Sequence, residues 1–274
     1  MVTLSDIPGR VVLVGAGKMG GAMLEGWISL GLAPSQVAVI DPGPPPEVVE
    51  LLERRGVALN PLNGGPPVVL LLAVKPQVAP EVLAKVAPLA GPHTLVVSVM
   101  AGRTLAFIEA AFAPGTAVVR SIPNTPAAIG RGVTVAVPNA AVTPDQLNIA
   151  DGLLRAIGGV EWVEDEDLID VATAVSGSGP AYVFLLAEAL AQAGAKAGLP
   201  ADLADRLARQ TVSGAGELIA RSGIDPAQLR KNVTSPNGTT AAALSVLMDE
   251  TAGFGPLLVE AVMAAARRSR ELAG

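Results

Sequence analysis

Residues 11–20 read VVLVGAGKMG, and this stretch decides the fold of the N-terminal half. Its apolar start predicts a buried strand, and the glycines that follow have the spacing Gly-x-Gly-x-x-Gly at the start of a predicted helix. Gly15 permits a tight turn, Gly17 lets a pyrophosphate approach the backbone, and Gly20 lets the helix pack closely on the strand. The free N–H groups of a helix start attract phosphate. We therefore interpret one segment as a dinucleotide-binding loop rather than an ordinary glycine-rich turn: Gly15, Ala16, Gly17, Lys18, Met19 and Gly20.

Asp41 ends the second predicted strand, 21 residues after Gly20. An acid at this position binds the hydroxyls of the adenosine ribose and repels a 2′-phosphate. No Lys or Arg follows until Arg54, so the pattern favours NADH over NADPH, unless Asp41 merely starts the turn at Pro42. At the end of the next apolar strand, Lys75 either contacts a phosphate or ribose or is simply solvated.

Short apolar runs alternate with helical patterns over the first 165 residues. Strands without polar positions are typical of a parallel sheet covered on both faces. We therefore assign residues 1–165 to a dinucleotide-binding α/β domain with a doubly wound sheet. Strands are predicted at Val11–Gly15, Val37–Asp41, Val68–Val74, Leu95–Val99, Ala117–Ser121 and Gly132–Val137, and helices at Gly20–Ser29, Glu47–Arg55, Pro80–Ala87 and Leu105–Ala111.

The pattern changes near residue 165, after which no convincing strand is found. Asp225 followed by Pro226 predicts an N-cap and the first residue of a helix. The other helices are predicted at Ala181–Ala197, Ala201–Ala220, Thr239–Met248 and Pro256–Leu272. We assign residues 166–274 to a second, all-helical domain.

Composition excludes several classes of protein. Half of the 274 residues are hydrophobic, so the chain has enough apolar material for a core and is not disordered. Its net charge is −6 without a basic run, so we expect no nucleic-acid partner. The chain has no cysteine and a single histidine, His93, which excludes disulfides and thiolate or His-rich metal sites. We expect no metal, and we expect His93 in a surface turn.

The N-terminal residues, MVTLSDIPGR, lack the basic, apolar and small-residue segments of a signal peptide. The longest uncharged apolar run, Val68–Val74, is far shorter than the ~20 residues that cross a bilayer. We therefore expect a soluble, cytoplasmic protein without a membrane partner.

Two segments of the helical half differ from ordinary helix sequence. Residues 175–182 read VSGSGPAY, and their small residues before an apolar helix permit close backbone approach or form a tight helix start. Residues 232–240 read NVTSPNGTT, which brings the hydroxyls of Thr234, Ser235, Thr239 and Thr240 to a helix start. A capping loop needs one hydroxyl, so the second segment predicts a site for a small anion such as a carboxylate.

With the glycine-rich loop, these two segments resemble pyrroline-5-carboxylate reductases over essentially the whole chain. The resemblance includes Ala73–Gln77, Arg120 with the Pro-Asn-Thr-Pro of residues 123–126, and Leu199-Pro200. The chain departs from the family in its short 63–68 connection and in Ile122, where Met is common. It also has Asn237-Gly238 where the family usually has Gly-Gly, and Asn is among the few residues that tolerate a positive φ.

The resemblance implies a Rossmann-type sheet followed by an all-helical dimerisation domain that forms an interlocked homodimer and, in some members, a ring of dimers. It implies hydride transfer from NADPH, the more frequent donor, or NADH to 1-pyrroline-5-carboxylate, giving L-proline. Thr240 would be the catalytic residue, hydrogen-bonded to the ring nitrogen. The substrate would lie among Glu166, Ser235, Gly238, Thr239 and Thr240. The implied cofactor contacts, besides the glycine-rich loop, are Asn63, Ala73, Val74, Lys75, Pro76, Val99, Met100, Ala101 and Asn232.

The chemistry of an imine agrees with these residues, because its nitrogen takes a proton from water or a hydroxyl and needs no His or Cys acid. One alternative is a hydroxy-acid dehydrogenase with a lysine acid, but Lys196 has Pro200 rather than Asn four residues later. Another is a dinucleotide-binding regulatory protein without turnover, which would not need the hydroxyls around Pro236.

Overall fold

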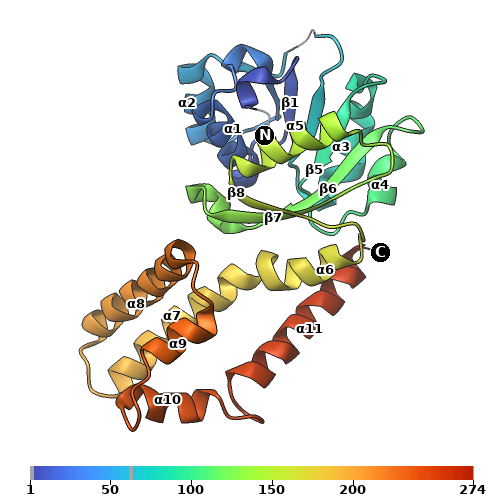
Figure 1. Cartoon of the computed structure of the whole chain (residues 1–274). Coiled ribbons are helices and arrows are strands. Elements are labelled where there is room, and N and C mark those ends of the chain that lie inside the picture. The colour runs from blue at the N-terminus through green and yellow to red at the C-terminus, as the bar shows by residue number, and fades with distance from the viewer. Residues whose placement is uncertain (1–2, 62–63, 274) are drawn as a thin grey trace. The chain divides into compact units, whose positions relative to one another are not determined.

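The computed structural model describes residues 3–61 and 64–273. The chain divides into two compact units (Figure 1). The first comprises Met1–Gly177 and Ala266–Gly274, and the second comprises Ser178–Ala265. We refer to them as the nucleotide unit and the helical unit.

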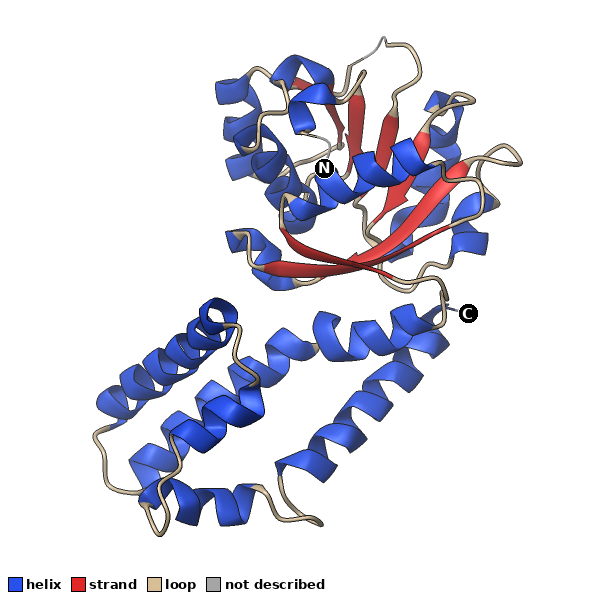
Figure 2. Ribbon diagram, viewed as in Figure 1, coloured by secondary structure: helices blue, strands red, loops and turns tan. Residues whose placement is uncertain are grey.

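The described residues of the nucleotide unit form one eight-stranded sheet of order β3-β2-β1-β4-β5-β6-β7-β8 (Figure 2). The strands are parallel from β3 to β6, as expected, while β7 runs antiparallel to β6 and pairs in parallel with β8. The strands are β1 (Val11–Val14), β2 (Val37–Ile40), β3 (Ala58–Leu59), β4 (Val69–Leu72), β5 (Leu95–Ser98), β6 (Ala117–Pro123), β7 (Gly132–Pro138) and β8 (Gly158–Trp162).

Helices cover both faces of this sheet because neighbouring strand residues point to opposite sides. On one face, Val11 and Leu13 pack with α1 (Lys18–Ser29), α2 (Pro46–Arg55) and α5 (Pro144–Arg155). On the other face, Val12 and Val14 pack with α3 (Ala79–Val86) and α4 (Leu105–Glu109). The expected doubly wound arrangement is confirmed.

The elements of the nucleotide unit that were not predicted include β3, β8, α5 and α6 (Leu168–Ala172). Strand β3 has two residues, both exposed, and β8 begins with Gly-Gly and has one buried position, so neither shows a run of buried residues. Helix α5 begins with a capping box in which Thr143 and Gln146 bond to each other's backbone N–H. That signal lies in the sequence and could have been read.

The remaining helices are α6 (Leu168–Ala172), α7 (Gly179–Lys196), α8 (Ala201–Ser222), α9 (Pro226–Asn232), α10 (Thr239–Leu247) and α11 (Phe254–Ala273), with a π-helical turn at Thr173–Gly177. No strand occurs between residues 166 and 273, as expected. Asp225 caps α9 by accepting the Ala227 and Gln228 N–H groups at 2.8 and 3.2 Å, which confirms the predicted helix start.

In the helical unit, α7 and α8 pack against each other, with Ala204 and Ala208 of α8 buried. None of the 18 residues of α7, all of which are described, is buried. Its large apolar side chains are exposed, among them Val183, Phe184, Leu185, Leu186 and Leu190. This apolar surface is unusual for a single chain and is typical of a protein interface.

The division into two compact units falls after Gly177, and the end of α11 belongs to the nucleotide unit. The domain boundary at residue 165 stays a prediction. A buried contact joins this end of α11 to α6, because Ser269 Oγ donates to Asp170 Oδ1 at 2.6 Å. Such a partner lies 99 residues away in the sequence, so no local pattern reveals it.

The helical stretch Leu168–Lys196 is long and apolar enough to cross a membrane by length and composition, with a mean hydropathy of 1.3. This differs from the expectation based on uninterrupted apolar runs, because uncharged Ser, Gly and Thr residues interrupt the stretch and its charged residues are only Asp170, Glu188 and Lys196. A single helix of this kind is weak support for a membrane span, because packing helices of other proteins have the same composition.

Candidate active site

The glycine-rich loop between β1 and α1 has the geometry of a phosphate-binding turn. Gly15 has a φ of 90°, a conformation that side chains rarely adopt. A Cβ on Gly20 would collide with the Gly15 carbonyl oxygen, whereas a Cβ on Gly17 would have no atom within 4 Å. Helix α1 starts after Gly17 without a side-chain cap, so its first N–H groups are open to a ligand. The residues present therefore fit the pyrophosphate of a dinucleotide.

Asp41, directly after β2, is held against this loop. Its Oδ2 accepts the Ala16 N–H at 2.7 Å, and its Oδ1 accepts the Gly43 N–H at 2.8 Å. Asn60 exchanges two hydrogen bonds with the Asp41 backbone, at 3.0 and 2.7 Å. Asp41 therefore takes part in the turn that begins at Pro42, which was one of its two interpretations. The same hydrogen bonds fix its carboxylate at the end of β2.

Most of the other expected cofactor residues of this unit follow the ends of β4, which neighbours β1, and of β5, which neighbours β4. The Ala73 N–H bonds to the Val14 carbonyl at 2.7 Å, and the Val99 N–H bonds to the Leu72 carbonyl at 3.0 Å. These bonds align the loops Ala73–Pro76 and Val99–Ala101 at the carboxyl edge of the sheet, where ligands of such folds bind. Within them Lys75 and Ala101 are exposed, whereas Val99 and Met100 are buried. Asn63 lies outside the described residues.

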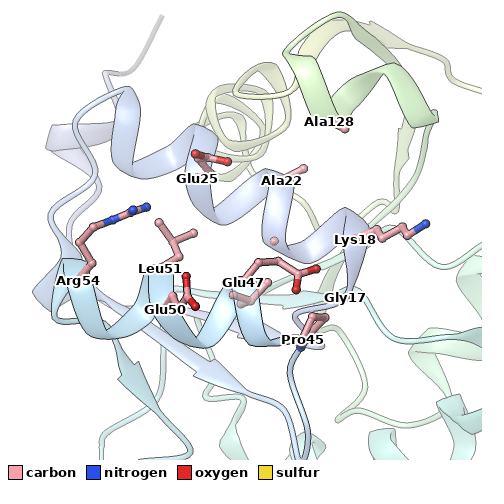
Figure 3. Close-up of a pocket in the computed structure, with 12 residues that line it drawn as sticks. Gly17, Lys18, Ala22, Glu25, Pro45, Glu47, Glu50, Leu51, Arg54 and Ala128 are labelled. Carbon is pink, nitrogen blue, oxygen red and sulfur yellow. The ribbon is translucent and has the colours of Figure 1, made fainter.

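A hollow of about 400 Å³ lies between α1 and α2, beside Gly17 (Figure 3). The carboxylates of Glu25, Glu47 and Glu50 line it together with the cations of Lys18 and Arg54. The acidic lining makes the hollow unsuitable for the pyrophosphate, which we assign instead to the helix start.

Arg103, which was not predicted as a site residue, connects the two loops. Its Nε and Nη2 donate to the Pro76 carbonyl at 3.2 and 2.7 Å. Its guanidinium lies 4.5 Å from the centroid of the Phe107 ring. A basic residue just after a strand at the ligand-binding edge is a signal that could have found it.

Glu166, expected near the substrate, belongs to a buried network of the nucleotide unit. Its Oε1 lies 2.6 Å from Nη1 of Arg120, whose side chain is 4% exposed, and it accepts the Leu105 N–H at 2.7 Å. Arg120 Nη2 also lies 3.9 Å from Asp170 Oδ1, which Ser269 contacts. Two carboxylates compensate this buried cation. Glu166 Oε2 has no hydrogen bond within the described part of the chain, and its side chain is 29% exposed.

The Pro-Asn-Thr-Pro segment and the Ser-Gly-Ser-Gly-Pro segment, far apart in sequence, meet through Asn124. Asn124 Nδ2 donates to the Ser176 carbonyl at 3.0 Å, and its Oδ1 accepts the Val133 N–H at 2.9 Å. Ser176 lies in the π-helical turn Thr173–Gly177, a feature common at functional sites. His93, as expected, lies exposed in a turn.

In the helical unit, the hydroxyl-bearing loop leads into the start of α10. The Gly238 N–H bonds to the Ser235 carbonyl at 3.0 Å, and Asn237 has a φ of 60°, which agrees with a type II turn after Pro236. Asn237 thus adopts the positive φ that asparagine is able to tolerate. Gly238 is the N-cap of α10 and provides no side-chain cap, so the first N–H groups of the helix are open.

The hydroxyls of this loop are used differently. Thr234 Oγ1 donates to the Arg230 carbonyl at 2.6 Å, so its hydroxyl belongs to the end of α9. Ser235, Thr239 and Thr240 make no side-chain hydrogen bond within the described residues. Asn232 ends α9, and its Oδ1 accepts from Gln228 Nε2 at 2.7 Å. The expected substrate residues other than Glu166 therefore gather at one helix start.

Comparison with known proteins gives the family. Residues 166–272 match the family model for pyrroline-5-carboxylate reductase dimerisation, and residues 10–102 match that for NADP oxidoreductase, coenzyme F420-dependent. Pyrroline-5-carboxylate reductase of Pseudomonas aeruginosa is 39% identical over 271 residues, covering 96% of this chain and 97% of that protein. The enzyme of Synechocystis is 51% identical over 204 residues, covering 74% of each.

Solved structures agree. The reductase of Coxiella burnetii superimposes with a TM-score of 0.88 at 34% identity, covering 97% of this chain and 99% of that one. The enzyme of Plasmodium falciparum, solved with NADP bound, gives 0.79 at 26% identity, covering 98% and 99%. The sheet and the open helix start agree with these relatives, which are matched over almost their whole length. The chain therefore belongs to the pyrroline-5-carboxylate reductase family.

Proposed function

We propose that the start of α10 is the substrate-binding element with which this chain performs the reaction of its family, the NAD(P)H-dependent reduction of 1-pyrroline-5-carboxylate to L-proline, the last step of proline biosynthesis. One observation carries the proposal. The first N–H groups of α10 have no side-chain cap, while the Ser235, Thr239 and Thr240 hydroxyls stand beside them. An uncapped helix start with hydroxyls is a site for a carboxylate.

The substrate residues then have separate tasks. The N–H groups after Gly238, with the Ser235 and Thr239 hydroxyls, bind the substrate carboxylate. The Thr240 hydroxyl donates to the ring nitrogen and so is the catalytic residue. Glu166 is the further substrate contact that the family implies, and its Oε1 is paired with Arg120.

The bound nicotinamide nucleotide supplies the hydride. We assign its pyrophosphate to residues 15–20, Gly15, Ala16, Gly17, Lys18, Met19 and Gly20, and its adenosine ribose to Asp41. The nicotinamide half lies against Ala73, Val74, Lys75, Pro76, Val99, Met100 and Ala101, with Asn63 and Asn232 as further contacts. The open space beyond Gly17 and the fixed Asp41 carboxylate support this assignment.

Reduction of the imine needs a proton at nitrogen and a hydride at carbon. A hydrogen bond from Thr240 polarises the carbon–nitrogen bond, and the proton comes from water or the hydroxyl. The carboxylate contact at α10 fixes the flat ring, so orientation contributes much of the rate. This agrees with a chain that has no cysteine and whose one histidine is exposed.

The dimerisation domain indicates that the chain oligomerises. We propose an interlocked homodimer, assembled in turn into a ring of dimers, in a cytoplasmic enzyme. The exposed apolar side chains of α7 support a second copy of this chain as the partner. A homodimer buries such surface without any other protein.

Steady-state reduction of pyrroline-5-carboxylate, with NADH and NADPH in parallel assays, tests the function. We expect proline formation with at least one nucleotide. Nucleotide binding without any turnover would instead indicate a regulatory protein. Oxidation of a hydroxy acid but not of proline would indicate a hydroxy-acid dehydrogenase, although Pro200, the N-cap of α8, stands four residues after Lys196.

A further inference from the structure

Arg103 connects two loops that end neighbouring parallel strands. It follows the β5 loop, Val99–Ala101, and it donates through Nε at 3.2 Å and through Nη2 at 2.7 Å to the carbonyl of Pro76 in the β4 loop. Pro76 directly follows Lys75 and begins a short 3-10 helix, Pro76–Val78. A planar guanidinium that directs two N–H groups at one carbonyl fixes distance and orientation together.

The guanidinium is itself held in place. Its carbon lies 4.5 Å from the centroid of the Phe107 ring, within the range of a cation–π contact. Thr104, the next residue, caps α4 by accepting the Phe107 N–H at 3.1 Å. The backbone next to Arg103 and the Phe107 ring that its guanidinium contacts are both held in place. The side chain of Arg103 therefore loses little conformational entropy when it bonds to the Pro76 carbonyl.

The β5 loop is also fixed on its other side. The Leu105 N–H bonds to Glu166 at 2.7 Å, and Glu166 pairs with the buried Arg120. Gly102 has a φ of 65°, and a Cβ built on it would lie 3.4 Å from the Leu272 carbonyl oxygen of α11. The two hydrogen bonds of Arg103 to the Pro76 carbonyl connect the β4 loop to this framework.

Sheet topology shows which part of a dinucleotide these loops face. The order β3-β2-β1-β4-β5-β6 reverses between β1 and β4. The half with the glycine-rich loop and Asp41 takes the adenosine, so the half with β4 and β5 takes the nicotinamide ribose and ring. Arg103 lies in the second half, away from Asp41.

We propose that Arg103 is a positioning residue that sets the spacing of the β4 and β5 loops for the nicotinamide half of the cofactor. The proposal rests on the proposed function. Arg103 acts through Pro76 and need not touch the nucleotide. Lysine should not replace it, because an ammonium on a flexible stem cannot direct two fixed donors at one carbonyl.

Binding of two probes separates positioning from general stabilisation. NADH occupies both halves of the site, whereas ADP lacks both the nicotinamide and the ribose attached to it. Calorimetric Kd values for both probes would be measured on the full chain and on Arg103→Lys and Arg103→Ala, with Tm recorded for each. Arg10→Ala is the matched control, since Arg10 Nη2 donates to the Gly65 carbonyl at 2.9 Å just before β1, at the opposite edge of the sheet.

We expect both Arg103 variants to raise the Kd of NADH about 10-fold, the loss of a charged hydrogen bond, and to leave the Kd of ADP within about twofold. We also expect kcat to fall, because hydride transfer depends on orientation. Equal weakening of both probes, or of neither, would overturn the proposal; if Arg103→Ala does not fold, Arg103→Lys decides. Failure of the unaltered chain to bind NADH would count against the proposed function instead.

Discussion

The carboxylate of Asp41 accepts a hydrogen bond from the backbone N–H of Ala16 at 2.7 Å, so the acid that follows β2 is fixed against the phosphate loop. A second bond, from the Gly43 N–H at 2.8 Å, holds the other oxygen. The carboxylate therefore cannot turn aside for a 2′-phosphate without losing both bonds. The loop that follows, residues 42–46, contains one glycine and four prolines and no cation to attract that phosphate.

We predict that NADH binds more tightly than NADPH, by about 10-fold or more, because like charges placed together cost at least ~1.4 kcal/mol. Asp41→Ser should narrow the difference, since a serine hydroxyl can still accept the Ala16 N–H without carrying a charge. Calorimetry with both nucleotides measures the effect, and Glu47→Gln in the first turn of α2 is the control. Tighter binding of NADPH by the unaltered chain would contradict the prediction.

Thr240→Ala should lower kcat/KM for pyrroline-5-carboxylate by roughly 10- to 100-fold, the size of one oriented hydrogen bond. Steady-state kinetics would be compared with those of Thr234→Ala. That control removes a hydroxyl from the same loop, but one already bonded to the Arg230 carbonyl. Unchanged kinetics in Thr240→Ala would remove Thr240 from the mechanism.

Two glycines of the phosphate loop should respond differently to alanine. Gly20→Ala should destabilise the fold by about 1–3 kcal/mol, because its Cβ would collide with the Gly15 carbonyl. Gly17→Ala should keep the Tm but weaken NADH binding, because its Cβ would occupy only the open space expected to hold the pyrophosphate. Thermal melts and binding titrations check both. A stable Gly17→Ala that binds NADH normally would argue against the assigned phosphate position.

Phe184→Glu should weaken subunit association, because it places a charge on the apolar surface of α7, where Phe184 is 65% exposed. Light scattering after size-exclusion chromatography measures the mass as a function of concentration. Leu30→Glu is the control, because Leu30 is 57% exposed but follows α1 of the nucleotide unit. If both variants keep the mass of the unaltered protein, α7 does not form the interface.

The turn between α10 and α11 should be sensitive to acid. Hydrogen bonds from the Thr251 hydroxyl and from the Ala252 and Thr251 N–H groups lower the pKa of Asp249. A lowered native pKa means that ionised Asp249 stabilises the turn above the unfolded pKa of ~3.9, and that this stabilisation is lost as pH falls through the native value. Thr251→Val should raise the titration midpoint of Asp249 followed by NMR. An unchanged midpoint would show that the Thr251 hydroxyl is not the main cause.

Much of the fold could be predicted because it depends on local patterns. Strands β1, β4 and β5 are fully buried and therefore read as apolar runs. Gly15, Asp225 and Asn237 mark turns and caps through their own backbone preferences. The short exposed β3 and the reversed direction of β7 depend on neighbouring strands, so no local pattern revealed them.

The candidate site shows the same limit. The hydroxyls of residues 234–240 were visible in the sequence, but the bond from Thr234 to Arg230 was not. Glu166 was expected beside the substrate, yet its strongest contact is Arg120, 46 residues away. The fold decides which groups compensate a buried charge, so only the structure shows that Glu166 Oε1 pairs with Arg120.

Helix α7 has 18 residues and buries none of them within its own chain. A helix in this state gains its hydrophobic free energy when a second copy arrives, so folding and assembly become one equilibrium. Dilution should therefore destabilise this protein, and the midpoint of thermal unfolding should rise with protein concentration. The rate at which newly synthesised chains reach the native state should also depend on protein concentration.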